Sequence, residues 1–221
     1  MPLLTTGAGR YGAAAAVIGS VVWDQATAGP NLTFPTAVSV NGHGVSSTSI
    51  VKTTTAHNSG KYYSEFTVDL ISFKGEIGLA NISLPNTGWD LGNDGNPSNS
   101  CALWTSGAFF ANANGGGLTV LNNPVTSGHT VDMAVNLDDV PNLIWFRTDN
   151  GVWNPLLAAT QDPALPAGTG GGIPFRTLNS SVMGAGPYYI AFGTWLCNLT
   201  ARFASASWIN TGTKPAGYLE W

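Results

Sequence analysis

Residues 142–154, NLIWFRTDNGVWN, decide the fold class of this chain. An aromatic-rich run is followed by the pair Asn150-Gly151 and then by a second run that starts with Val152-Trp153. Asn-Gly between two strand-like runs is among the strongest hairpin signals in a sequence, because both residues tolerate the positive φ of a tight turn. We therefore expect a β-hairpin here and a β protein as a whole.

Several other runs alternate between apolar and polar residues, which is the pattern of a strand with one buried face. Residues 130–137 and 62–70 alternate most regularly, and we expect the second face of each run to meet water. The expected strands are residues 47–54, 62–70, 76–81, 102–111, 130–137, 143–148, 188–192 and 196–203. No run has a helical period. The pattern predicts an all-β chain with two antiparallel sheets stacked as a β-sandwich.

The connection between Asn154 and Pro187 is long and rich in Pro and Gly. It contains four Pro and a run of three Gly, so it cannot supply a central strand, which needs backbone donors along its length. We expect it to run over the surface of one large domain that extends over residues 21–221.

Charged residues make up only 9% of the 221 residues, against about 25% in ordinary soluble domains. The net charge is −4 and the eight Lys and Arg are scattered, so the chain has no basic stripe for nucleic acid. No apolar run approaches the roughly 20 residues that span a bilayer, and no signal peptide is evident. We expect a soluble protein, made without Sec export, that neither enters membranes nor binds nucleic acid.

Residues 1–20, MPLLTTGAGRYGAAAAVIGS, are rich in Gly and Ala and predict a separate N-terminal arm. Within the arm, residues 7–12 satisfy the pattern GxGxxG. A dinucleotide site also needs a βαβ unit with parallel strands, whereas everything downstream indicates antiparallel strands. We expect an arm that is flexible or that docks the domain elsewhere. The candidate docking residues are Leu3, Leu4, Arg10 and Tyr11.

Five segments occur in an order that is typical of one family. They are GKYYSEFTVD (60–69), EIGLAN (76–81), GHTVDMAVNLDD (128–139), LIWFRTDNGVW (143–153) and YYIAFG (188–193). In order and spacing they resemble the strands of the SPRY domain, and ARFASASWINTGTKPAGYLEW (201–221) resembles its closing segment. The resemblance implies a SPRY or concanavalin-like jelly roll that binds a protein segment or another ligand through loops at one edge. It implies no catalytic residue and no cofactor.

With its polar, Gly-rich composition and its short N-terminal arm, this chain is similar to the SPRY-like domains of bacteriophage and prophage virion proteins. This resemblance implies a head decoration, fibre or tail-associated protein at the virion surface. Its partners would be other virion proteins, or a glycan or protein of the host surface, and it would act as a homo-oligomer or within a larger assembly.

Two alternatives stay open. One is a lectin-like glycan binder or a glycosidase that uses the strand face with Glu65 and Asp69, since glycoside cleavage uses paired carboxylates. The other is an intracellular, cytoplasmic SPRY adaptor.

Loop residues near the strand ends are the candidates for ligand contact, because exposed aromatic rings provide large rigid contact area there. The candidates, chosen from loop position alone, are Trp89, Asp90, Asn93, Asp94, Asn96 and Trp153. We expect most of the eight Trp to fill the core and Trp89 and Trp153 to be exposed.

Three further groups of residues could in principle bind a metal, catalyse a reaction or form a disulfide. The segment after Trp89 is similar to a calcium loop, but its twelfth position is Cys101 where such loops have a bidentate Glu, so we predict a solvated turn and no metal. His43, His57 and His129 have no partner motif and are expected at loops or strand ends. Cys101 and Cys197 are expected as two buried thiols, and a single disulfide between them stays open.

Overall fold

The structure is a computed structural model, and it describes residues 21–44, 47–94, 99–111, 117–157, 160–166, 168–176, 183–210 and 214–221. The predicted arm, with Leu3, Leu4, Arg10, Tyr11 and the GxGxxG pattern, lies outside the described residues, and so does Asn96. What was expected of these residues stays a prediction.

The described residues form twelve strands and two short 3₁₀ helices, which confirms the predicted all-β class. The strands are β1 (Leu32–Thr33), β2 (Ser39–Gly42), β3 (Ser49–His57), β4 (Lys61–Ala80), β5 (Ser100–Trp104), β6 (Ala108–Phe110), β7 (Leu118–Thr119), β8 (Thr130–Asn136), β9 (Asn142–Thr148), β10 (Ile173–Arg176), β11 (Tyr188–Arg202) and β12 (Leu219–Glu220). The helices are η1 (Gln25–Thr27) and η2 (Ser205–Ser207).

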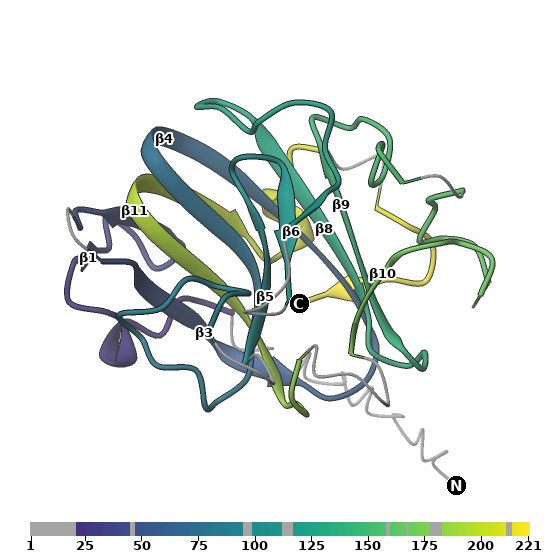
Figure 1. The fold of residues 1–221 in the computed structure, drawn as a ribbon, viewed down its shortest axis with the longest axis horizontal. Coiled ribbons are helices and arrows are strands. Elements are labelled where there is room, and N and C mark those ends of the chain that lie inside the picture. Colours follow the sequence, from purple (N-terminus) through teal and green to yellow (C-terminus); the bar gives the residue numbers. More distant parts are fainter. Residues whose placement is uncertain are drawn as a thin grey trace, which may run out of the picture.

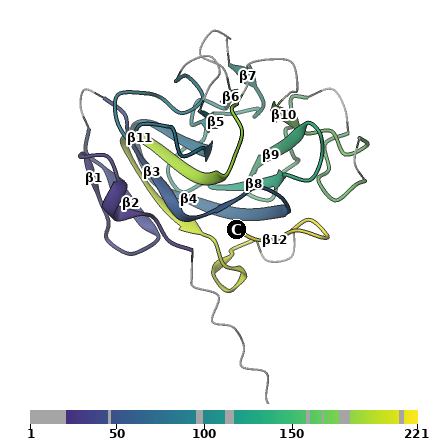
Figure 2. The same cartoon turned by 90° about the horizontal axis from the view of Figure 1, so that it is seen from below.

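Two long strands, β4 and β11, connect the layers of the fold. They pair antiparallel over most of their length, from Tyr189 opposite Ala80 to Arg202 opposite Glu65, and they curve side by side through the molecule (Figure 1). At one end β11 pairs with β3, and β4 pairs with β5, which continues to β6 and β7. At the other end β11 pairs with β2, and β4 pairs with β8, which continues to β9 and β10. The predicted β-sandwich is confirmed, with both layers belonging to one continuous curved sheet (Figure 2).

The bend of this strand pair was not expected from the sequence. Residues 62–70 and 76–81 were predicted as two strands but are two halves of β4, and β11 likewise joins two predicted strands. The register of β11 shifts between Trp195 and Cys197 and again before Leu199, and Leu196 has φ 52°. These irregularities let the two strands change direction without breaking their pairing.

The space between the layers is filled by one large apolar cluster. It includes Trp23, Phe66, Phe146 and Phe192, all of them buried. Cys101 and Cys197 are free and buried in the same cluster, as expected. Trp89 is exposed and five of the eight Trp are buried, as expected of most of them, although of these only Trp23 and Trp221 belong to this cluster.

The hairpin after β9 forms one residue earlier than the sequence predicted. Asp149 and Asn150 have positive φ, at 50° and 61°, and the Gly151 N–H donates to the Thr148 carbonyl over 2.8 Å. The run after the turn is not a strand. Instead Asn154 pairs with Phe146: its N–H donates to the Phe146 carbonyl over 2.7 Å, and its Oδ1 accepts from the Phe146 N–H over 2.9 Å. The side-chain oxygen of Asn154 therefore takes the place that a backbone carbonyl of a second strand would have opposite Phe146.

The second face of β8 and the first part of that of β4 are buried, so the expectation that these residues meet water was wrong, whereas Asp69 farther along β4 is exposed as expected. All seven residues of β8 are buried, as are Tyr63 and Glu65 of β4. A second apolar cluster on this outer face joins Tyr63 and Ala134 to Trp153, Trp208 and Tyr218. The C-terminal segment after β11 thus covers polar and apolar residues alike. Sequence alternation could not reveal this cover, because it comes from distant residues: Asn210 lies 145 positions from Glu65 and 78 positions from Asp132.

The connection between Asn154 and Pro187 contributes β10, which pairs with β9 at Ile173 and Pro174. β9 is its one partner among the described strands. A Pro is tolerated on such an edge because no further strand needs its missing N–H. The prediction that this connection supplies no central strand is therefore confirmed.

Candidate functional site

The structure separates the candidate contact residues into different environments. The Trp89 side chain is 48% exposed, as expected, whereas Trp153 is only 7% exposed, so the prediction of an exposed Trp153 was wrong. Its ring packs against Tyr63 and lies under the guanidinium of Arg147, 4.2 Å from the ring centroid. The hairpin turn folds Trp153 back onto the outer face of the sheet, which its loop position did not reveal.

The loop after Trp89 is held by its own hydrogen bonds. The buried Asp94 accepts from the Asn99 N–H and from the Ser100 hydroxyl, both over 2.7 Å. The Asn93 N–H donates to the Asp90 carbonyl over 3.0 Å. Asp94 was expected in a solvated turn, but its carboxylate is buried and stabilises the loop, whereas its contact with a ligand stays a prediction.

Glu65 is fully buried, so the predicted polar face for glycoside cleavage is not available. Its carboxylate accepts from the Tyr63 hydroxyl over 2.9 Å and from the backbone N–H of Ile209 over 2.6 Å and of Asn210 over 3.1 Å. Asp69, on the same strand, accepts from the Thr200 hydroxyl at the surface. A carboxylate enclosed by three donors and covered by the C-terminal segment cannot reach a substrate, so Glu65 has a structural role.

One exposed and three half-buried aromatic rings gather where β4 and β11 bend. Phe73, on β4, is 60% exposed and stacks on Trp195 of β11 with ring centroids 5.0 Å apart. Beside them Trp104, at the end of β5, stacks on Phe110 of β6 at 4.0 Å. We call these four residues the aromatic platform. Two stacked ring pairs, brought together from four strands, make a rigid apolar surface.

Lys74 joins the two ring pairs. Its Nζ lies 4.2 Å from the Trp104 ring centroid and 5.4 Å from that of Trp195. The same ammonium forms ion pairs of 2.7 Å with Glu76 and with Asp90. Asp90, one of the residues predicted from its loop position, therefore reaches the aromatic platform through Lys74.

Glu76 lies beneath the platform and is fully buried. Its carboxylate accepts from the Leu91 N–H over 2.8 Å in addition to its ion pair with Lys74. Burial raises the pKa of Glu76 to about 7, against the opposing effect of the Lys74 charge, and the charge of Asp90 raises it further. The carboxylate links the loop that follows Trp89 to the strand that carries the aromatic rings.

A groove of about 380 Å³ runs along the platform. It is lined by Ile71, Phe73, Lys74, Trp104, Thr105, Ser106, Pro124 and Val125. Apolar walls with a few hydroxyl groups are suited to receiving a side chain of a partner.

Metal binding and membrane insertion have no structural signal in the described part of the chain. Within these residues no three His, Cys, Asp or Glu side chains gather as they would around a metal ion. No helix there has the length and apolarity needed to cross a membrane. His43, His57 and His129 lie at strand ends or in loops, as expected.

Comparison with known proteins identifies the architecture. The sequence matches no protein-family profile and no curated protein. Among solved structures, the SPRY domain of human HERC1 superposes with a TM-score of 0.55 at 12% identity, over 81% of this chain and 96% of that one. The chain has the fold of a SPRY domain. The PSpry domain of TRIM65 is also similar, with a TM-score of 0.51, 16% identity and coverage of 82% and 88%.

In this SPRY-like fold the aromatic platform lies at the bend of the two long strands that both layers share. Sequence reasoning found the neighbouring Asp90 but missed Phe73, which adjoins a run that reads as ordinary strand. Trp104 and Trp195 were placed near strand ends, but Trp89 and Trp153 were preferred to them as contact residues. One available signal was the pair Phe73-Lys74, which interrupts the alternation of β4 before Gly75. An aromatic residue at such an interruption can point outward where the strand turns.

Proposed function

We propose that this chain is a protein-interaction module that binds an exposed segment of a partner protein on the aromatic platform. The observation that carries the proposal is Phe73, a large apolar side chain that is 60% exposed yet held rigidly on Trp195. Exposed apolar area of this kind is costly unless a partner covers it, and rigid aromatic anchors dominate the binding energy of interfaces. The SPRY-like fold supports the proposal, because the resemblance implies a binding module.

The chemistry of the groove favours a partner segment with an apolar or aromatic anchor. Such a side chain would enter between Phe73 and Trp104, against Pro124 and Val125. Lys74 already has two carboxylate partners, so it does not call for an acidic anchor. The exposed Ser106 also lines the groove and offers a hydroxyl group to the backbone of the segment, whereas the buried Thr105 hydroxyl already accepts from the Gly75 N–H.

Peptides selected from a displayed random library against the folded protein test this proposal. Phe73→Ser removes the exposed ring, and we expect it to weaken binding of the selected peptides by at least about tenfold. The matched control is Val140→Ser, which removes another exposed apolar side chain from the loop between β8 and β9. Equal binding by the wild type and Phe73→Ser would show that the platform is not the binding surface.

We further propose that the module belongs to a bacteriophage particle and is exposed on the virion surface, where it binds other virion proteins or a host-surface protein. The low content of charged residues and the resemblance to phage SPRY-like domains support this proposal. Residues 1–20 would dock the domain to its assembly, in which it acts as a homo-oligomer or with other subunits. Mass spectrometry of purified particles tests the location, and deletion of residues 1–20 tests the docking. Absence from particles would favour a cytoplasmic adaptor.

A further inference from the structure

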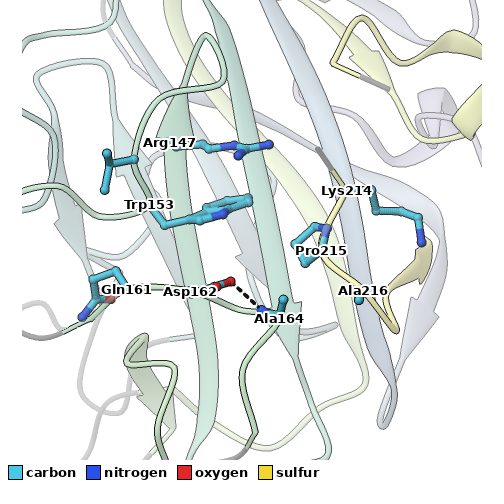
Figure 3. A pocket seen from close by; sticks show the side chains of 9 residues that line it. Arg147, Trp153, Gln161, Asp162, Ala164, Lys214, Pro215 and Ala216 are labelled. Atoms are coloured by element: carbon cyan, nitrogen blue, oxygen red, sulfur yellow. Dashed lines mark hydrogen bonds between the residues drawn. The ribbon is translucent and has the colours of Figure 1, made fainter. Parts of the chain in front are cut away.

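A second pocket lies far from the platform, on the outer face of β8 and β9. Its volume is about 440 Å³, and Figure 3 shows the residues that line it. One wall is the Trp153 ring with Arg147 above it, and the opposite wall is the segment of Pro215 and Ala216. The loop that carries Asp162 closes the lower side. The pocket therefore forms where the hairpin turn, the long connection and the C-terminal segment meet.

The back of the pocket is a fixed charged network. Arg147 Nε donates to the buried Asp132 carboxylate over 2.6 Å, and Asn210 Nδ2 donates to the same carboxylate over 2.9 Å. Because Arg147 is also stacked on Trp153, the indole ring cannot swing away from its position. The pocket is thus built on a rigid wall before any ligand arrives.

Two polar groups of opposite kind face the space. The Trp153 Nε1–H donates to no acceptor in the described part of the chain, unlike the indole nitrogens of Trp104, Trp145 and Trp208. The Asp162 carboxylate uses Oδ1 to accept from the Ala164 N–H over 2.9 Å and is otherwise open to a ligand. In Figure 3 the Trp153 ring and the Asp162 carboxylate point into the same space, while the Lys214 ammonium is turned away, toward the Tyr218 carbonyl that accepts from it.

We infer that this pocket binds a neutral sugar unit of a glycan. An indole N–H can only donate and a carboxylate can only accept, so a ligand that satisfies both needs an acceptor and a donor together. Hydroxyl groups meet this requirement, whereas an ammonium or a carboxylate ligand satisfies only one of the two. Pro215, Ala164 and Ala216 supply small apolar contacts that suit the C–H faces of a sugar ring. The volume lies within the range of small-molecule sites.

The inference does not depend on the platform, and it differs from the glycosidase hypothesis in both site and chemistry. It uses Asp162 in place of the buried Glu65 and involves no bond cleavage. If the sugar site fails, binding of a partner protein on the platform is unaffected. If the platform fails, the pocket beside Trp153 still makes its own prediction.

NMR titration of the indole N–H signals tests the inference with a panel of neutral methyl glycosides. Trp153→Phe keeps an aromatic ring beside Arg147, removes the N–H donor and identifies the Trp153 signal by its loss. We expect at least one glycoside, at millimolar to tens of millimolar concentration, to shift that signal and leave the Trp104 and Trp195 signals in place. Because Trp153 is buried, the variant can fail to fold, so a second variant is needed.

Asp162→Asn is that second variant. Its amide oxygen can still accept from the Ala164 N–H, so the loop is retained. An NH2 group replaces the other carboxylate oxygen, so the sugar loses its acceptor. We expect glycoside affinity to fall by about tenfold or more, as for hydrogen bonds to a charged group, whereas Val140→Ser, at an exposed residue that does not line the pocket, binds the sugar like the wild type. Three results would overturn the inference: no glycoside shifts the Trp153 signal, Asp162→Asn binds unchanged, or acetate and lysine methyl ester shift the signal as strongly as the sugars.

Discussion

Glu76 should make the stability of the fold depend on pH in a defined direction. Its pKa is about 7 in the folded protein, chiefly because it is buried, against 4.5 as the ordinary value. Between these two values the folded state holds a proton that the unfolded state has released. Folding is therefore most favoured below about pH 4.5, and the contribution of Glu76 is lost as pH rises through 7. A difference of about 2.5 pKa units corresponds to about 3 kcal/mol.

The perturbation that tests this is Glu76→Gln, which has nearly the same shape and does not titrate. The amide oxygen can still accept from the Leu91 N–H, so the loop contact is retained. Urea unfolding of both proteins at several values between pH 4.5 and 8 gives their free energies of unfolding. We expect wild type to lose about 3 kcal/mol relative to the variant over this range. A difference that stays constant with pH, or that changes in favour of wild type, would refute the reasoning.

Three further predictions concern the outer face, the strand packing and the thiols. Arg147→Met should lower the free energy of unfolding by about 3–5 kcal/mol, because the charge of the buried Asp132 loses its ion-pair partner and keeps only the neutral donor Asn210. The added change Asp132→Asn should restore part of this loss in urea titrations. Equal free energies of unfolding for the single and double variants would contradict this prediction. Gly78→Ala should abolish the cooperative thermal transition, since a Cβ there would lie 1.9 Å from the Cys101 carbonyl oxygen. A variant that unfolds at the wild-type transition temperature would contradict this prediction. Burial raises the pKa of the Cys101 and Cys197 thiols, that of Cys197 to about 12. Neither thiol should therefore react with a disulfide reagent until urea is added. Rapid labelling of the native protein would disprove their burial.

The features that the sequence predicted correctly are those with a local cause. Alternation in residues 130–137 located β8, because a strand that faces an apolar interior places every second side chain there, and the aromatic-rich run before the turn located β9. The turn after β9 was also predicted, since Asp149 and Asn150 both tolerate positive φ, although the structure uses this pair where Asn150-Gly151 was expected. Local patterns give the type of element well and its position only within a residue or so.

The features that were missed have long-range causes. Glu65 and Asp132 read as water-facing because each alternates with apolar neighbours, yet Asn210 from the C-terminal segment covers both. Trp153 read as an exposed loop residue, but the turn returns it to the same covered face. The aromatic platform forms because the bend brings β4 and β11 next to the end of β5. Neither the cover nor the bend has a signature within a single run of residues.

The central claim is that the aromatic platform is the binding surface for a partner protein. The most direct test is NMR mapping of the tightest selected peptide on the folded protein, read from the eight indole N–H signals and the backbone amides. We predict that the signals of Trp104 and Trp195 and the amides around Phe73 and Lys74 shift together, while the Trp153 signal stays in place. Shifts centred on any other face, with the Trp104 and Trp195 signals unmoved, would contradict the account.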